Sequence, residues 1–266
     1  MPKILITGAS SGLGAALARD YAKTADVGLV LWGRNRERLD AVAADCRSRG
    51  AQVEIVCFDI RDIDLLVASL KELDERNPLD LAIFNAGVGG TTPLDIRSEA
   101  PERVYEQVTV NFTAPAVGAA TIAERMAARA RGHIVLIGSV AGSFPLPMSP
   151  TYSAAKAGLA MFAEALRLRL EPHGVTITLV VPGFVDTPMS RGLPGPQPFL
   201  MTAEAAAAAI VGKVASRATR FVLPRPYAAI QVLAHFLPRG LTRTVLRRIH
   251  RRIEAQERSD KFNRIE

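Results

Sequence analysis

Short, strongly apolar runs alternate with helix-length segments along most of this 266-residue chain. The runs carry few charges, which is typical of strands buried on both faces of a sheet. They lie at residues 3–7, 27–32, 53–58, 79–84, 133–138, 175–181 and 220–223. Strands that alternate with helices form right-handed βαβ units, because each helix carries the chain back across the sheet. The sequence therefore predicts an α/β fold built on a parallel sheet.

The first run leads into a glycine-rich loop, Gly8-Ala9-Ser10-Ser11-Gly12-Leu13-Gly14, and then into an alanine-rich helix that ends near Tyr21. In a strand–loop–helix of this kind, backbone N–H groups and the positive end of the helix dipole face an anion. Glycine lets the backbone approach that anion and lets the helix pack closely on the sheet. We therefore predict a phosphate-binding loop.

The same loop also matches G-x-S-x-G, the pattern that presents a nucleophilic serine in α/β-hydrolases, with Ser10 as the serine. A serine hydrolase needs a histidine at a neighbouring strand end. His133 begins a strand, and His173 lies between a helix and the next strand, at the end of the sheet opposite the loop. A serine hydrolase that uses Ser10 is therefore a remote alternative.

The second strand is followed by Gly33-Arg34-Asn35-Arg36, with Arg34 twenty residues after Gly14. In a dinucleotide-binding fold, an acidic residue at this point accepts hydrogen bonds from the ribose 2′-OH of NAD, whereas an arginine pairs with a 2′-phosphate. No Asp or Glu ends this strand. The sequence therefore favours NADP(H) over NAD(H).

Four polar residues further along the chain are candidates for catalysis. Tyr152 and Lys156 share one face of a predicted helix, because they are four residues apart. An ammonium beside a phenol favours the phenolate, so we expect Lys156 to lower the pKa of Tyr152 and make it a usable proton donor or acceptor. Ser139 follows the strand at 133–138, at the end where ligands bind in such sheets. Asn111 is unusual inside the helix predicted over 101–130, because its amide competes for backbone groups.

Cysteine and histidine usage argues against metal and disulfide chemistry. Cys46 and Cys57 are in no metal or redox motif, and the four histidines have no partner at ligand spacing. We expect no metal site and a reducing, cytoplasmic setting. No apolar run approaches the roughly 20 residues that span a bilayer.

Charge is distributed unevenly between two parts of the chain. Residues 220–266 hold eleven Lys/Arg and four Asp/Glu, which accounts for the whole net charge of +7. We expect a domain over 1–223 and a basic, helical extension over 224–266, with an apolar stripe on a helix at 241–253. Such an amphipathic helix either binds an anionic membrane, through residues 225–258, or packs on the protein or another subunit. The extension lacks interleaved aromatics, so no nucleic acid is expected.

In order and spacing, the chain from Pro2 to about Leu223 resembles the short-chain dehydrogenase/reductase family. The shared residues are Thr7-Gly8-x-x-x-Gly12-x-Gly14, Asp59, Asn85-Ala86-Gly87, Asn111, Ser139, Tyr152-x-x-x-Lys156 and Pro182-Gly183. The resemblance implies a Rossmann-type, doubly wound sheet of seven parallel strands with helices on both faces. It also implies hydride transfer between a nicotinamide cofactor and a carbonyl group. Residues 225–266 extend beyond the family's shared core.

Residue by residue, the resemblance implies a catalytic set in which Tyr152 is the general acid/base and Ser139 hydrogen-bonds the substrate oxygen. Lys156 holds the nicotinamide ribose, and Asn111 supports a proton-relay water. The implied cofactor site comprises Gly8, Ser10, Ser11, Gly12, Leu13, Gly14, Arg34, Asp59, Ile60, Asn85, Ala86, Gly87, Tyr152, Lys156, Pro182, Gly183, Val185 and Thr187.

The function predicted from the sequence is an NADPH-dependent carbonyl reductase that acts on an apolar or lipid-like ketone. Residues 189–200 are rich in Pro, Gly, Met, Leu and Phe, and we expect them to form an apolar lid over the site. Relatives are usually dimers or tetramers joined through the helices at 101–130 and 152–171, so we expect a homodimer or homotetramer. The alternative function is a nucleotide-binding sensor or scaffold of the same fold without turnover.

Overall fold

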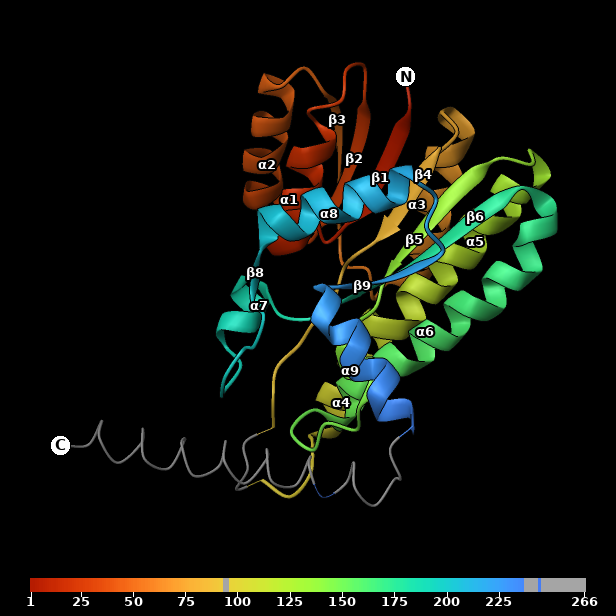
Figure 1. Ribbon diagram of the computed structural model, residues 1–266. Coiled ribbons are helices and arrows are strands. Elements are labelled where there is room, and N and C mark those ends of the chain that lie inside the picture. Colours follow the sequence, from red (N-terminus) through yellow and green to blue (C-terminus); the bar gives the residue numbers. More distant parts are fainter. Residues whose placement is uncertain (93–95, 237–243, 245–266) are drawn as a thin grey trace.

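The structure is a computed structural model that describes residues 1–92, 96–236 and 244. Within these residues the main sheet has seven parallel strands in the order β3-β2-β1-β4-β5-β6-β9 (Figure 1). The strands are β1 (Lys3–Thr7), β2 (Gly28–Gly33), β3 (Gln52–Cys57), β4 (Leu81–Phe84), β5 (Gly132–Ile137), β6 (Val175–Pro182) and β9 (Arg220–Leu223). The predicted seven-stranded parallel sheet is confirmed.

Helices cover both faces of this sheet, as the alternation of strands and helices predicts. One layer contains α1 (Gly12–Tyr21), α2 (Arg36–Ser48) and α8 (Ala203–Ala215). The other contains α3 (Ile63–Arg76), α4 (Pro101–Val108), α5 (Ala114–Ala128) and α6 (Pro150–Leu170). Successive side chains of a strand point to opposite faces, so Ile4 and Ile6 pack in the first core and Leu5 in the second. Both cores combine alanines with larger apolar side chains, and each strand contributes to both.

The strand order reverses between β1 and β4. These two strands pair with each other, and β1 pairs with β2 on its other side. From β1 the chain builds outward through β2 and β3, and it then returns to add β4, β5, β6 and β9 on the other side. At such a switch point the loops that follow the two central strands diverge and leave a crevice at the carboxyl ends. The glycine loop after β1 and Asn85-Ala86-Gly87 after β4 therefore face the same space.

The helix predicted over 101–130 is interrupted in its middle. α4 ends at Val108, a π-helical turn spans Thr109–Thr113, and α5 then continues from Ala114. Pro115 has no N–H to donate to the carbonyl of Asn111 four residues earlier, which favours the wider turn. Asn111 is thus the central residue of the wide turn rather than an ordinary interior helical residue.

Between β6 and α8 the chain forms a small subassembly of short elements. β7 (Val185–Asp186) pairs in parallel with β8 (Met201–Thr202), and α7 (Pro188–Arg191) lies between them. The Thr187 hydroxyl caps α7 by accepting a hydrogen bond from the N–H of Ser190. The segment predicted as a lid therefore begins in a helix that is held against β7, where Ser190 Oγ donates to the carbonyl of Val185.

The extension begins as predicted in a helix, α9 (Arg225–Phe236), directly after β9. The amphipathic helix predicted over 241–253 lies outside the described residues, apart from Thr244. In the part of the chain that the structure describes, no helix has both the length and the apolar character needed to cross a membrane. α9 packs against β9 and the short turn Val140–Ser143, so the first part of the extension is integrated with the domain.

Candidate active site

A cavity of about 830 Å³ lies at the carboxyl ends of the strands, where the switch point predicts a ligand site. Every residue of the predicted cofactor site lines it, as does Ser139. Asn111 alone among the predicted residues lies behind the wall. Residues that are distant in sequence are thereby brought together around one space, from the glycine loop to the segment that follows β6.

The glycine loop is held in place by β4. Thr7 Oγ1 accepts hydrogen bonds from the N–H groups of Asn85 and Ala86, both at 3.0 Å, and Asn85 Nδ2 donates to the carbonyl of Thr7 at 3.0 Å. Gly8 has a φ of +70°, and a Cβ on Gly14 would lie 2.1 Å from the carbonyl oxygen of Gly8. Only glycine fits at Gly14, so the N-terminus of α1 stands close to the cavity with its N–H groups directed toward it.

The end of the cavity beside β2 is basic. Arg34 and Arg38 line it, and Arg34 Nη1 lies 3.3 Å from Asp59 Oδ2. Asp59 also accepts hydrogen bonds from the N–H and guanidinium of Arg61. Burial would raise the pKa of Asp59, but the bonds from Arg61 and Arg34 outweigh it and lower that pKa. The ionised carboxylate holds one nitrogen of Arg34 and leaves the rest of the guanidinium open to an anion.

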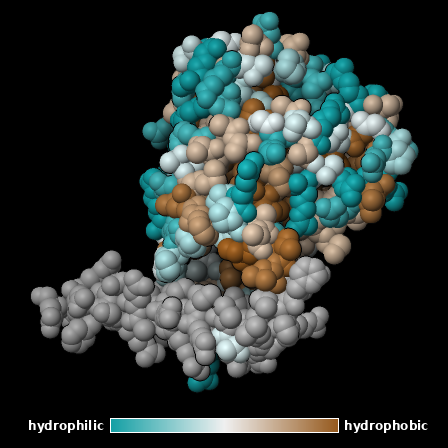
Figure 2. All heavy atoms as spheres, viewed as in Figure 1, coloured by the Kyte–Doolittle hydropathy of each residue, from teal (hydrophilic) through white to brown (hydrophobic). Residues whose placement is uncertain are grey.

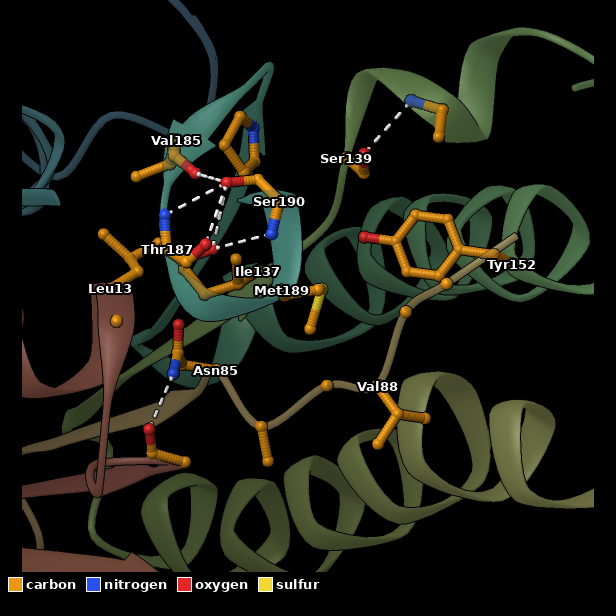
Figure 3. Close-up of a pocket in the computed structure, with 18 of the residues that line it drawn as sticks. Leu13, Asn85, Val88, Ile137, Ser139, Tyr152, Val185, Thr187, Met189 and Ser190 are labelled. Carbon is orange, nitrogen blue, oxygen red and sulfur yellow. Dashed lines mark hydrogen bonds between the residues drawn. The ribbon is translucent and has the colours of Figure 1, made fainter. Parts of the chain in front are cut away.

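The opposite end contains the predicted catalytic residues Tyr152, Lys156 and Ser139. Figure 3 shows the Tyr152 hydroxyl pointing into the cavity toward Ser139 and Met189. Ser139 Oγ accepts a hydrogen bond from the N–H of Ala141 at 3.1 Å, so its own hydrogen is available to donate. Two hydroxyl groups are therefore directed at the same region.

Lys156 is buried beneath Tyr152, and its Nζ lies 5.8 Å from the centre of the tyrosine ring. The ammonium donates to the carbonyl of Ile137 at 2.9 Å. Burial lowers the pKa of Lys156 to about 8. Burial also raises the pKa of Tyr152, and only the hydrogen bond with Ser139 opposes that shift. The expectation that Lys156 lowers the pKa of Tyr152 is wrong for this arrangement, because Lys156 is directed at a backbone carbonyl and desolvation of the phenol dominates.

Asn111 is fully buried and holds the loop that follows β4. Its Nδ2 donates to the carbonyl of Val88 at 2.8 Å, and its Oδ1 accepts from the N–H of Val88 at 3.2 Å. The side chain therefore pairs with the backbone of one residue, as a neighbouring strand would do. This fixes Val88, which does line the cavity, opposite Tyr152.

Apolar residues complete the cavity around Tyr152, some from the segment predicted as a lid and some that the sequence did not single out. Phe144, Leu146 and Met148 come from the loop before α6, and Met189 comes from α7. Tyr227 of α9 also lines the cavity, and its hydroxyl donates to the carbonyl of Pro198 at 2.8 Å. A tyrosine early in a helix beyond the last strand gives no sequence signal, because its place depends on how that helix packs. The extension thus supplies part of the wall.

The hydrolase alternative finds no support in the placement of the histidines at 133 and 173. His133 is buried at the amino end of β5, where its Nε2 lies 2.8 Å from Thr178 Oγ1. His173 precedes β6, also at the amino end. Ser10 follows the carboxyl end of β1, so the sheet separates it from both residues.

The site fits a nicotinamide dinucleotide. Glycine at position 14 lets α1 pack directly against the Gly8 carbonyl, so the N-terminus of the helix faces the cavity, and Arg34 and Arg38 line the cavity at the β2 end. A doubly wound sheet with such a loop at its switch point defines a dinucleotide-binding α/β protein. The chain belongs to the short-chain dehydrogenase/reductase family of oxidoreductases, since a sequence model described as short chain dehydrogenase matches residues 2–197.

Individual relatives agree with this assignment. An uncharacterized oxidoreductase from Myxococcus xanthus is 36% identical, with the match covering 92% of this chain and 96% of that protein. A short-chain dehydrogenase from Sphingobium yanoikuyae, solved in complex with NADPH, is 30% identical, with a TM-score of 0.78 over 90% of this chain and 97% of that one. A very-long-chain 3-oxoacyl-CoA reductase from Podospora anserina is 31% identical over 75% of this chain and 61% of that protein.

Proposed function

We propose that this protein is an NADPH-dependent carbonyl reductase that converts an apolar ketone into a secondary alcohol. One observation carries the proposal: a single cavity joins a phosphate-binding loop and two arginines at one end to Tyr152 and Ser139 among apolar walls at the other. A dinucleotide whose phosphates were held by the loop would extend toward Tyr152 and Ser139 within the same cavity.

The cofactor is NADP(H), because Arg34 at the β2 end of the cavity can pair with a 2′-phosphate. No Asp or Glu stands at the end of β2 to repel that phosphate. Arg34 retains free N–H donors after its bond to Asp59, and a guanidinium pairs well with a phosphate. Asn35 and Arg38 line the same end. The NADPH-bound relative from Sphingobium yanoikuyae supports this choice.

When bound, the cofactor supplies hydride to the carbonyl carbon. Negative charge then grows on the carbonyl oxygen, and the Tyr152 hydroxyl delivers a proton to it while the Ser139 hydroxyl donates a hydrogen bond. Burial keeps Tyr152 protonated at neutral pH, so it is ready to act as the acid. Lys156 has two N–H donors beyond the one that reaches Ile137, and these hold the ribose hydroxyls. Asn111 links the wide π-helical turn to the loop after β4 through its hydrogen bond to the carbonyl of Val88.

The substrate is apolar because the walls beside Tyr152 are apolar. Phe144, Leu146, Met148 and Met189 offer dispersion contacts and few hydrogen-bonding groups. The relative from Podospora anserina, a very-long-chain 3-oxoacyl-CoA reductase by name, supports a lipid-like ketone. A relative from Comamonas testosteroni, described as a bulky-bulky ketone specific alcohol dehydrogenase, is 27% identical with a TM-score of 0.75 over 90% of this chain and 96% of that one.

Two further features belong to the same proposal. We place the homodimer or homotetramer contact on α4 and α6, where Tyr105, Met161 and Leu168 are exposed apolar side chains. Cys46 and Cys57 are free thiols, which supports a reducing compartment such as the cytoplasm. Sedimentation analysis of the Met161→Ser/Leu168→Ser protein tests the contact, and an unchanged oligomer would exclude this face.

The decisive experiment is NADPH oxidation against ketones and 3-oxoacyl thioesters of increasing chain length, with Tyr152→Phe as the control. We expect a rate that rises with chain length and is absent in the variant. Tight NADPH binding with no turnover on any ketone would instead favour the sensing or scaffold role.

Arg34 and Arg36 give a matched test of cofactor choice. Arg34 lines the cavity, whereas Arg36 is directed at Asp40 on the same helix. Arg34→Leu is expected to weaken NADPH binding about tenfold or more with little change for NADH, because one charge-assisted pair to the 2′-phosphate is lost. Arg36→Leu should leave both affinities unchanged. Equal affinity of the wild-type protein for NADH and NADPH would contradict the role of Arg34.

A further inference from the structure

Exposed apolar side chains lie next to Pro198 and Tyr227, two residues that line the cavity. Five of them form what we call the mouth rim, namely Phe199 (51% exposed), Leu200 (48%), Ile230 (41%), Val232 (61%) and Leu233 (63%). The first two precede β8, and the other three belong to α9. In Figure 2 hydrophobic atoms gather at the lower end of the described part, over α9 and over the segment with α7 and β8 as labelled in Figure 1.

The part of the mouth rim before β8 contacts α9, which carries the other part, and this contact adjoins the cavity. The rings of Phe199 and Tyr227 meet edge to face with centres 5.6 Å apart. The Tyr227 hydroxyl bonds to the carbonyl of Pro198, and both Tyr227 and Pro198 line the cavity. The apolar surface outside is therefore continuous with the apolar wall inside.

The outward side of α9 is apolar along its described length. Pro226, Ala229, Ile230 and Leu233 follow the i, i+3, i+4, i+7 spacing of one helical face, and all four are exposed. A helix that packs only on its own domain would direct this stripe inward. Instead the opposite side, with Tyr227, is the one that packs on Gly183 and the cavity.

The charges around the mouth suit an anionic surface. Four sequence segments that line this end of the cavity or continue from it, residues 87–92, 144–149, 187–201 and 224–236, contain no Asp or Glu and two arginines, Arg191 and Arg225. Residues 225–266 as a whole hold ten Lys/Arg and four Asp/Glu. Apolar side chains beside an excess of basic residues are the composition of segments that lie in the interface of an anionic bilayer.

We propose that the mouth rim docks on an anionic lipid bilayer, with the cavity mouth facing the lipid. A second protein copy on the same surface would close the mouth, whereas a bilayer covers the apolar rim and delivers apolar molecules to it. As regards the substrate, the proposal rests on the proposed function: the ketone passes from the acyl region along Phe199 and Tyr227 to Tyr152 without crossing water. The docking itself does not depend on turnover.

Flotation of the full-length protein with lipid vesicles tests the docking. The probes are vesicles of phosphatidylcholine alone and vesicles in which about one third of the lipid is phosphatidylglycerol. We expect wild-type protein to float with the anionic vesicles. Leu200→Ser/Leu233→Ser should reduce the bound fraction about tenfold or more, because two side chains lose their apolar contact with the acyl region. Leu65→Ser on α3 is the matched control, since Leu65 is 42% exposed and α3 contributes no residue to the cavity.

Each outcome bears on the proposal. Binding that is equal in wild-type and Leu200→Ser/Leu233→Ser protein and is abolished by salt would assign it to the basic extension and overturn docking through the mouth rim. Wild-type protein that stays with the soluble fraction would overturn docking on a bilayer. A double variant with a changed oligomeric state would show that the mouth rim contacts a second copy of the protein instead. Equal melting temperatures of the variants exclude misfolding.

A kinetic measurement separates this proposal from the proposed function. With a water-soluble ketone, wild-type and Leu200→Ser/Leu233→Ser proteins should turn over equally. With a long-chain ketone dissolved in anionic vesicles, the double variant should be several-fold slower. Equal rates on the vesicle substrate would contradict delivery through the mouth rim, whereas no turnover on either ketone would contradict the reductase function and leave the flotation result to stand alone.

Discussion

At the amino end of the sheet the carboxylate of Asp74 is buried between two arginines, whereas at the carboxyl end the ammonium of Lys156 is buried against a single backbone carbonyl. Asp74 accepts hydrogen bonds from Arg125, Arg129 and the N–H of Leu79. Lys156 Nζ donates, among the described residues, to Ile137. Both charges are almost completely removed from solvent, but only the first is neutralised within the protein.

The same contrast holds for the uncharged polar groups. At the amino end, Thr178 Oγ1 contacts His133 and donates to the carbonyl of Ala218 at 2.6 Å. The hydroxyl hydrogen of Thr178 is therefore already engaged within the protein. At the carboxyl end the Tyr152 hydroxyl points into the cavity, which Ser139 also lines (Figure 3). A ligand site needs donors that the protein has desolvated and left available, and this costs stability. One sheet therefore carries a stabilising end and a functional end.

The largest expected effect is at the functional end. Tyr152→Phe removes the proton donor and should lower kcat about a thousandfold or more, because general acid catalysis contributes factors of this order. The NADPH dissociation constant should change little, since the ring remains. Stopped-flow NADPH oxidation and fluorescence titration measure the two quantities. Turnover close to that of the wild type would remove Tyr152 from the mechanism.

Asp74→Asn tests the stabilising end. Burial alone would raise the pKa of Asp74, but the bonds from Arg129, Leu79 and Arg125 lower it, so the group is ionised and holds both arginines. Its neutralisation should lower the free energy of unfolding by about 2–3 kcal/mol, with NADPH binding unchanged. Asp40→Asn is the control: its partner Arg36 is exposed, and the loss should stay below about 0.5 kcal/mol. Equal losses in urea unfolding would refute the contrast between buried and exposed pairs.

His133 makes the stabilising end sensitive to pH. Burial, with a smaller effect from Arg217, lowers the pKa of His133 to about 4. The unfolded chain takes up this proton near pH 6.5, so the stabilisation is complete above that pH and is lost as the pH falls toward 4. Between pH 7 and 5 the wild type should lose about 2 kcal/mol through this residue. In His133→Val, urea unfolding at pH 7 and pH 5 should show a loss of unfolding free energy that is smaller by about this amount. An equal loss in the variant and the wild type would contradict the role of His133.

Lys156→Met should change the free energy of unfolding less than Asp74→Asn does, and with the opposite sign. The folded pKa of about 8 lies below the unfolded value, so the charged lysine destabilises the protein at neutral pH and ceases to do so as the pH rises through 8 to about 10.4. An apolar side chain of similar length should raise the free energy of unfolding at pH 7 by about 1–2 kcal/mol while turnover falls. A destabilised variant in thermal or urea unfolding would show that the bond to Ile137 outweighs the cost of burial.

Local patterns predicted much of the fold and of the candidate site. Strand and helix alternation led to the parallel sheet, because each strand needs only its own apolar residues to be recognised. The glycine loop, the spacing of Tyr152 and Lys156, and the missing acid beside Arg34 are likewise short-range features. The sequence also showed that asparagine is unusual inside a helix at position 111. The structure explains this residue by a π-helical turn beside Pro115.

What the sequence determined by itself is therefore the sheet, its helices and the identity of the residues at the strand ends. Only the tertiary structure decided that Tyr227 of the extension meets Pro198 and walls the cavity, and that Phe144 and Met189 stand beside Tyr152. It also decided the direction of the Tyr152 pKa, because desolvation depends on everything packed around the ring. These outcomes arise from contacts between segments far apart in the chain, and local periodicity carries no information about which distant surfaces will meet.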